Sequence, residues 1–284
     1  MELNGLVFPS PKFDFSIVKQ FDDELIYIPI NNENNNHIPC LFIRDKSSKL
    51  SKNFIIFFHG NAEDVFLARN IGYSLQRKIG MNIVIVEYPG YSLYEGESDA
   101  ETILKNTVII YDFVKKTFKL EEKNMFVFGR SIGTSPAIYL SSIRKPNALF
   151  VVSSFTSIRA VADNLVGPLK YLLKDRLTSK DYIKNVTCPI LFIHGQSDPL
   201  IPFKETLLLK EKCNCPFEVL LPEEMTHNDF DLDEDIIEPI YKFIKKNCIV
   251  DEEKNDFKKI ENEIGQLYKM PKKVESFIIK NLNK

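Results

Sequence analysis

The chain alternates short, unbroken apolar runs with longer stretches in which apolar residues recur at helical spacing. Unbroken apolar strands are typical of a parallel sheet that is buried on both faces. Six such runs lie at residues 54–58, 83–86, 125–128, 149–152, 190–193 and 217–221. Helices are predicted between and after them, at residues 65–79, 100–118, 132–143, 203–213 and 233–247. This alternation predicts an α/β protein with helices on both faces of the sheet.

A pair of strands is predicted before these elements, at residues 25–30 and 38–44. The asparagine-rich segment 31–36 between them favours a turn, because Asn side chains bond to nearby backbone and tolerate left-handed conformations. An antiparallel hairpin at a sheet edge brings the prediction to a mostly parallel sheet of about eight strands. Because the sequence contains no Pro/Gly/Ser-rich linker and no internal repeat, residues 1–249 are predicted to form one domain.

Two segments depart from the alternation. Residues 155–185 mix apolar and basic side chains and are too short for a cap domain, so they are predicted to form a short lid. Residues 250–284 are highly charged and predict a helical C-terminal extension, with its first half packed as an appended helix. The apolar positions at helical spacing are Phe257, Ile260, Ile264, Leu267, Val274, Phe277, Ile278 and Leu282.

A second interpretation of the same extension is that it contacts a membrane surface. The residues that suggest it are Lys269, Lys272, Lys273, Phe277, Ile278, Ile279, Lys280 and Lys284. A packed helix with a solvated basic face is the preferred interpretation.

Composition narrows the class of protein. The 284 residues are 44% hydrophobic with a formal net charge of −2, which gives no overall basic excess for binding nucleic acid. The five cysteines form no Cys-x-x-Cys pair, so neither a zinc site nor a disulfide framework is predicted, and no metal or cofactor is expected. No apolar run reaches the roughly 20 residues of a membrane span, and the N-terminal residues lack a basic signal-peptide region. A cytoplasmic protein is expected, soluble or attached to a membrane surface.

Candidate chemistry begins at residues 125–137, where an apolar run leads through Gly-x-Ser-x-Gly into small-residue helical sequence. In such a turn the serine takes a strained backbone conformation, and the flanking Gly129 and Gly133 remove side chains that would collide. The hydroxyl of Ser131 then stands exposed above the sheet and is predicted to be a nucleophile. The alternative is a plain strand-to-helix turn, because a five-residue pattern alone is weakly specific.

A serine hydroxyl needs a base to take its proton and an acid to orient that base. His227 follows the last predicted strand and fits the chain order serine, acid, histidine that this architecture uses. The other histidines are His37 in the hairpin, His59, which is predicted to be structural, and His194.

Asp198 is the predicted acid, because it lies on the loop directly after the run 190–193. Loops at the carboxyl ends of parallel strands line the same crevice as the serine. Asp163 and Asp175, after the preceding strand, are the alternatives. Asp229 is too close in sequence to His227 to brace it and is predicted to be a surface carboxylate.

The oxyanion of a tetrahedral intermediate needs hydrogen-bond donors. The predicted donors are the backbone N–H of Ile132 and that of Asn61 or Ala62, on the loop after residues 54–58. Apolar residues in and beside the lid are predicted to line a groove for an acyl tail, although they would also serve to close the domain's own core. These residues are Phe155, Leu165, Val166, Leu169, Leu172 and Leu173.

Five motifs occur in order: His59-Gly60-Asn61-Ala62, Glu87-Tyr88-Pro89-Gly90-Tyr91-Ser92, Gly129-Arg130-Ser131-Ile132-Gly133-Thr134, His194-Gly195-Gln196-Ser197-Asp198 and His227-Asn228-Asp229. Through them the sequence resembles the α/β-hydrolase-domain serine hydrolases over residues 6–247, and most closely the subgroup that contains protein depalmitoylases. The resemblance implies the α/β-hydrolase fold and the triad of Ser131, Asp198 and His227. That subgroup carries an N-terminal cluster of palmitoylated cysteines, whereas the first cysteine here is Cys40. Ser92 also replaces a glycine that is usual in the second motif.

These features predict a cofactor-free serine hydrolase that cleaves an acyl ester or thioester through an acyl-enzyme. A short lid leaves the site open, which suits an acylated protein or a lipid-like ester. The fold alone does not separate a palmitoyl-protein thioesterase from a lysophospholipid or small-ester carboxylesterase. A non-catalytic binding protein on the same scaffold is less favoured, because all three triad residues are present.

Overall fold

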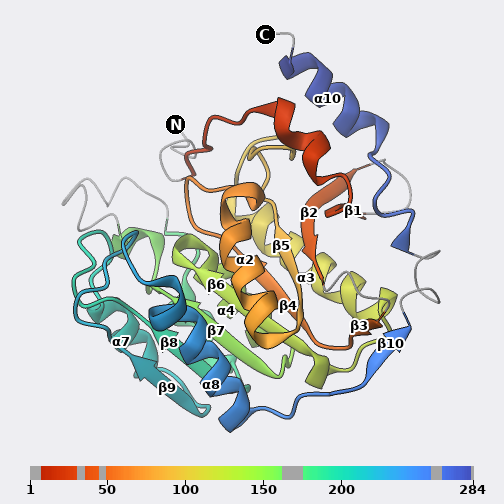
Figure 1. Cartoon of the computed structure of the whole chain (residues 1–284). Helices are drawn as coiled ribbons and strands as arrows, with labels where there is room; N and C mark the ends of the chain where they lie inside the picture. Colours follow the sequence, from red (N-terminus) through yellow and green to blue (C-terminus); the bar gives the residue numbers. More distant parts are fainter. Residues whose placement is uncertain (1–7, 31–35, 45–48, 162–174, 257–263, 283–284) are drawn as a thin grey trace. The chain divides into compact units, whose positions relative to one another are not determined.

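The computed structural model describes residues 8–30, 36–44, 49–161, 175–256 and 264–282 (Figure 1). The chain divides into two compact units, one formed by residues 122–251 and the other by residues 2–121 together with 252–284.

Four parallel strands form the framework of the unit 122–251. They are β6 (Met125–Arg130), β7 (Ala148–Val152), β8 (Ile190–Ile193) and β9 (Phe217–Leu220), hydrogen-bonded in that order. Strands β6 to β8 are buried along their whole length, as the unbroken apolar runs predicted. Because all four strands point the same way, the loops at their carboxyl ends lie along one edge of the sheet.

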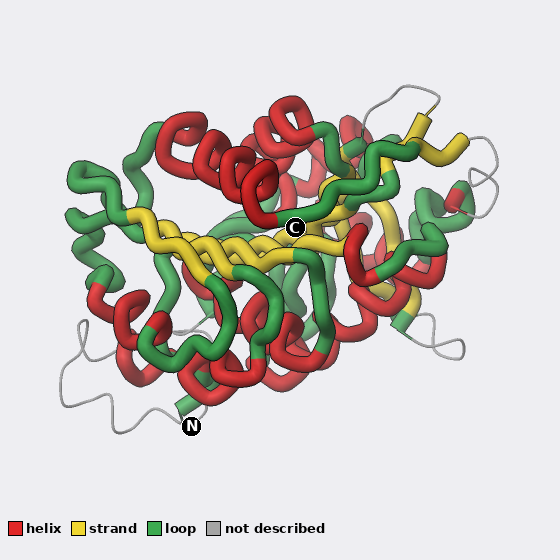
Figure 2. Tube along the Cα trace, turned by 90° about the horizontal axis from the view of Figure 1, so that it is seen from below, coloured by secondary structure: helices red, strands yellow, loops and turns green. Residues whose placement is uncertain are grey.

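Helices lie on both faces of the strands. Figure 2, turned by 90° from Figure 1, shows red helices above and below the yellow strands. Strand β6 leads through the 3₁₀ turn η3 into α4, whose Ser135 and Ala137 are fully buried. On α8, Phe243 contacts Phe150 of β7 with ring centroids 6.0 Å apart. The other elements follow the chain order. Their bounds are η2 (Glu122–Asn124), η3 (Ser131–Gly133), α4 (Thr134–Ile143), α6 (Ser179–Tyr182), η5 (Ile183–Asn185), α7 (Lys204–Lys210), the π-helix η6 (Leu232–Ile237) and α8 (Glu238–Asn247).

The second unit also contains four sheet strands, in the order β1, β2, β5, β4. Strand β1 pairs with β2, and β2 with β5, in antiparallel fashion, whereas β4 and β5 are parallel. The hairpin that the sequence predicted is therefore confirmed. The bounds are η1 (Phe15–Phe21), β1 (Leu25–Pro29), β2 (His37–Ile43), β4 (Phe54–Phe58), α2 (Val65–Ile79), β5 (Asn82–Val86) and α3 (Ala100–Thr117).

Helix α2 shows how local sequence sets an element's ends. Its N-cap, Asp64, accepts hydrogen bonds from two backbone N–H groups, and Gly80 ends it in a left-handed conformation with φ 74°. At Gly72 an added Cβ would lie 2.7 Å from the Cδ1 of Ile43, so the missing side chain lets the helix lie directly on the strands.

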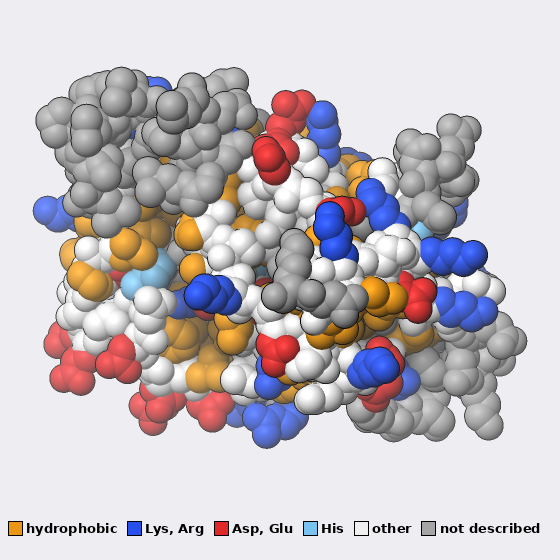
Figure 3. All heavy atoms as spheres, turned by 90° about the horizontal axis from the view of Figure 1, so that it is seen from above, with side chains coloured by type: hydrophobic (Ala, Val, Ile, Leu, Met, Phe, Trp, Pro, Cys, Tyr) orange, Lys and Arg blue, Asp and Glu red, His pale blue; other side chains and the backbone are white. Residues whose placement is uncertain are grey.

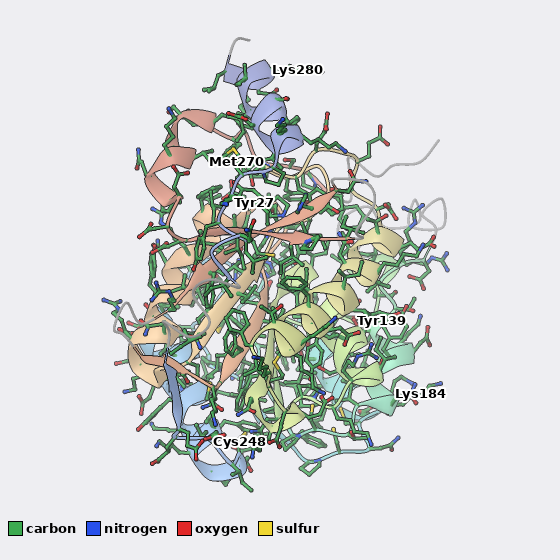
Figure 4. The ribbon with its side chains drawn as sticks, turned by 90° about the vertical axis from the view of Figure 1, so that its right-hand side faces the viewer. Tyr27, Tyr139, Lys184, Cys248, Met270 and Lys280 are labelled. Atoms are coloured by element: carbon green, nitrogen blue, oxygen red, sulfur yellow. The ribbon has the colours of Figure 1, made fainter. Side chains whose placement is uncertain are left out.

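The C-terminal extension is part of this second unit. The strand β10 (Lys254–Asp256) pairs with β3 (Lys49–Ser51), and the N–H of Tyr27 donates to the carbonyl of Leu267. Helix α10 (Lys272–Leu282) lies in the second half of the extension (Figure 4 labels Met270 just before it and Lys280 near its end). The sequence did not predict the two short strands, and Phe257 and Ile260 lie outside the described residues.

Over both units the described residues supply eight strands to a mostly parallel sheet flanked by helices, and the predicted fold class is confirmed. No helix in the described part of the chain is long and apolar enough to cross a membrane. On the face drawn in Figure 3, Lys and Arg side chains lie among Asp and Glu side chains, in keeping with the small net charge.

Candidate active site

The turn after β6 holds Ser131 in a left-handed conformation with φ 52°, which is strained for a residue with a side chain. A Cβ at Gly129 would lie 2.4 Å from the carbonyl oxygen of Gly133 and 2.8 Å from the Cβ of Ala137. Only glycine fits there, as the sequence predicted. The hydroxyl of Thr134 donates to the carbonyl of Ser131 at 2.7 Å and closes the turn.

His227 brings its ring to the serine. The Nε2 atom of His227 lies 2.9 Å from the Oγ of Ser131. The ring comes from a loop after β9 that is closed by its own hydrogen bonds, from the N–H of Thr226 to the carbonyl of Asp229 and from the N–H of Asp229 to the hydroxyl of Thr226. Both Ser131 and His227 are buried, with 5% and 7% of their surface exposed, so the predicted exposure of Ser131 is wrong.

Asp198 completes the chain of hydrogen bonds. Its Oδ2 accepts from the Nδ1 of His227 at 2.7 Å, while its Oδ1 accepts from the N–H groups of Leu200 and Ile201 at 2.9 and 2.8 Å. Burial opposes ionisation of this carboxyl, but hydrogen bonds from two histidine side chains and the Ile201 N–H hold the pKa of Asp198 well below its usual range. An ionised Asp198 only accepts hydrogen bonds, so the proton lies on Nδ1 and the Nε2 lone pair faces the serine.

Gly195 lets the acid loop approach the histidine loop. A Cβ at this position would lie 1.9 Å from the carbonyl oxygen of Met225. The same carbonyl accepts from the N–H of Ser197 at 3.3 Å, and the N–H of Gln196 donates to the carbonyl of Pro222 at 2.9 Å. Gly195 belongs to the fourth sequence motif, but no local pattern in the sequence indicates this contact.

The alternative acids have other partners or lie elsewhere. Asp175 accepts from the N–H of Arg159 and from Lys180, and Asp163 lies outside the described residues. Asp229 is exposed, as predicted. The structure therefore brings Asp198 to His227 and gives Asp175 a different environment.

His194, for which the sequence indicated no role, lies beside Asp198. Its Nε2 donates to the carbonyl of Ile201 at 2.8 Å and lies 3.4 Å from the Oδ2 of Asp198. Its Nδ1 lies 2.7 Å from the hydroxyl of Thr206, which in turn lies 2.6 Å from the hydroxyl of Ser154. These fully buried polar groups extend the hydrogen-bond chain away from the serine.

Arg130 was also missed, although it stands inside the Gly-x-Ser-x-Gly motif. Its Nη2 donates to the carbonyl of His227 at 2.7 Å and to the Oδ1 of Asn228 at 2.9 Å. The available signal was an arginine close after the apolar run 125–128, because an arginine at the end of a buried strand needs partners.

The predicted oxyanion donors fall in both units. Ile132 follows Ser131 in the first turn of η3. Asn61 and Ala62 belong to the other unit, where the Oδ1 of Asn61 accepts from the hydroxyl of Tyr91 at 2.8 Å and Ala62 has φ 55°. An oxyanion hole built from these donors stays a prediction.

The loop that carries Asn61 is held by His59, as its predicted structural role requires. The Nδ1 of His59 lies 2.9 Å from the carbonyl of Gly60 and its Nε2 lies 3.1 Å from Glu87. Burial would lower the pKa of His59, but the hydrogen bond and charge of Glu87 raise it.

The predicted substrate groove is described only in part. Phe155 is buried with 1% of its surface exposed, whereas the predicted lid residues Leu165, Val166, Leu169, Leu172 and Leu173 lie outside the described residues. The groove stays a prediction. Within the described residues, no group of three His, Cys, Asp or Glu side chains is placed to hold a metal ion.

A left-handed serine between β6 and α4, with histidine and carboxylate on loops after parallel strands, is the arrangement of the α/β-hydrolase fold. The sequence comparisons agree. The chain is 27% identical to human α/β hydrolase domain-containing protein 17B over 240 residues, which cover 84% of this chain and 82% of that protein. It is 30% identical to the mouse 17C protein over 209 residues, covering 74% of this chain and 64% of the relative. The chain thus resembles the α/β-hydrolase-domain proteins, as its motifs predicted.

Solved structures show the same fold. An esterase from Pyrococcus furiosus superposes with a TM-score of 0.65 at 16% identity, covering 84% of this chain and 98% of the esterase. No model of a known protein family matches the chain.

Proposed function

We propose that the chain is a serine hydrolase that cleaves acyl esters or thioesters through a covalent acyl-enzyme. The single observation that carries the proposal is the buried chain of hydrogen bonds from Ser131 through His227 to Asp198, with distances of 2.9 and 2.7 Å. A serine, a histidine and an ionised carboxylate in this order are the parts that nucleophilic acyl transfer requires.

In the proposed reaction, Nε2 of His227 accepts the Ser131 proton as Oγ attacks the acyl carbon. The charge of Asp198 stabilises the imidazolium that forms, and the imidazolium then protonates the leaving alcohol or thiol. In the second step, Nε2 of His227 accepts a proton from water, whose oxygen attacks the acyl carbon. The bond between the acyl carbon and Oγ then breaks, and Oγ takes the proton back from the ring. The Ile132 N–H would stabilise the oxyanion.

The proposed substrate is an acylated protein or a lipid-like ester with a medium or long acyl chain. The resemblance to the subgroup containing protein depalmitoylases supports this choice, as do the apolar residues of the predicted lid. A lysophospholipid or small-ester carboxylesterase is the second candidate, favoured by the esterase among the structural neighbours.

Hydrolysis of matched oxygen esters and thioesters with acyl chains of about 2 to 16 carbons tests the proposal. Each buried methylene contributes at most about 0.8 kcal/mol, so kcat/KM should rise by about two orders of magnitude between four and eight carbons. Thioesters should react at least as fast as the matched esters, and Ser131→Ala should abolish both activities. A maximum at acetyl would instead indicate a small-ester hydrolase. Absence of turnover with every substrate would indicate a binding protein on a hydrolase scaffold.

A further inference from the structure

We propose that Arg130 is a positioning residue that fixes His227 against Ser131, an inference that rests on the proposed function. Arg130 is the last residue of β6 and immediately precedes the serine. Only 4% of its surface is exposed. The guanidinium reaches a loop 97 residues further along the chain.

Three contacts join Arg130 to consecutive parts of the histidine loop. Nη2 donates to the carbonyl of His227 at 2.7 Å and to the Oδ1 of Asn228 at 2.9 Å, and the guanidinium carbon lies 5.4 Å from the ring centroid of Phe230. Hydrogen bonds from a charged donor are stronger than neutral ones, and a guanidinium also stacks on aromatic rings in a way that an ammonium does not.

The geometry explains how a contact on the backbone controls the ring. The loop is closed by hydrogen bonds between Thr226 and Asp229, so its backbone moves as one piece. The carbonyl of His227 is held by Arg130, while its ring faces Ser131, the first residue after β6. The positions of the proposed base and nucleophile are therefore both fixed by the end of β6.

Loss of this attachment should slow the chemistry without weakening substrate binding, because Arg130 acts through His227. A displacement of about 1 Å between reacting groups lowers rates by about 100-fold. We therefore expect Arg130→Met to lower kcat by about 10- to 100-fold with KM unchanged. Arg130→Lys should recover part of kcat, because its ammonium can still donate to the His227 carbonyl.

Arg144→Met is the matched control. It removes an arginine from the end of α4 in the same unit, where Nη1 bonds to the carbonyl of Ile143.

Hydrogen exchange measured by mass spectrometry gives a second readout that needs no turnover. In Arg130→Met, the peptide containing residues 225–230 should exchange faster, while peptides from β7 and β8 keep the wild-type rate. Arg130→Lys should lie between the two, and Arg144→Met should match wild type. A wild-type protein without hydrolase activity would refute the proposed function and leave this comparison intact. Unchanged loop exchange in Arg130→Met, or faster exchange spread evenly over residues 122–251, would overturn the positioning role.

Discussion

Replacing Asp198 tests whether the orientation and tautomer of His227 matter, because the histidine itself is kept. Replacement by Asn keeps the size of the side chain but allows an N–H to face Nδ1, which favours the wrong tautomer of the ring. Asp198→Asn should therefore lower kcat by about 10⁴-fold, measured with the best ester of the substrate series. Asp175→Asn is the control, since Asp175 bonds to Arg159 and Lys180 instead. A large loss of kcat in Asp175→Asn, together with nearly normal kcat in Asp198→Asn, would show that Asp198 is not the acid.

The sequence predicted the positions of some residues of the candidate site but not the partners of others. The approach of Ser131, Asp198 and His227 to one another was predictable, because each follows a predicted strand and the carboxyl-end loops of parallel strands lie at one edge of the sheet. The roles of Arg130 and His194 depend on side-chain direction and on partners that no local pattern specifies. Arg130, for instance, bonds to a loop that the chain reaches only after three further strands.

At the scale of elements, the approach of two loops depends on Gly195. In Gly195→Ala, the new Cβ would lie 1.9 Å from the carbonyl of Met225, so the loop that carries His227 must shift. We expect kcat to fall by about 100-fold. Gly80→Ala is the control for a general effect of glycine replacement, because it meets no atom within 4 Å but strains a left-handed residue. It should lower the free energy of unfolding by about 1 kcal/mol and leave kcat unchanged. Wild-type kcat in Gly195→Ala would show that the loops tolerate the displacement.

Helix α10 presents one face to its own unit and another to solvent. Val274 is buried, and Phe277 contacts Phe15 with ring centroids 5.7 Å apart, whereas Ile279 is 53% exposed. Val274→Asp should therefore lower the free energy of unfolding by about 2–4 kcal/mol, because it buries a carboxylate. Ile279→Asp should change it by less than about 0.5 kcal/mol. Urea unfolding measures both values, and equal effects would contradict a packed helix.

The two interpretations of the extension predict different behaviour with membranes. A packed helix with a solvated basic face predicts that Ile279→Asp leaves cosedimentation with anionic vesicles unchanged. Loss of vesicle binding in this variant, with stability intact, would favour peripheral membrane contact.

The elements themselves were largely predictable. Strands β4 and β8 and helix α2 occupy the residues predicted for them, because their apolar runs and caps are local signals. The strand pair β3 and β10 was not predicted. Lys254-Asn255-Asp256 carries no apolar alternation, and its pairing with Lys49–Ser51 depends on contacts between distant parts of the chain. The π-helix η6 likewise lacks a local pattern that separates it from an α-helix.

For the whole molecule, the proposed hydrolase activity requires Ser131 to be a nucleophile rather than a turn residue. Its left-handed backbone is strained, and such strain persists at functional sites because the surrounding structure maintains it. A fluorophosphonate probe reacts with an activated serine as an acyl group would, and the modified peptide can be identified by mass spectrometry. We predict one adduct, on Ser131, in the wild-type protein, and none in Ser131→Ala, with the free energy of unfolding little changed. An adduct on a different serine, or labelling that persists in Ser131→Ala, would contradict the central claim.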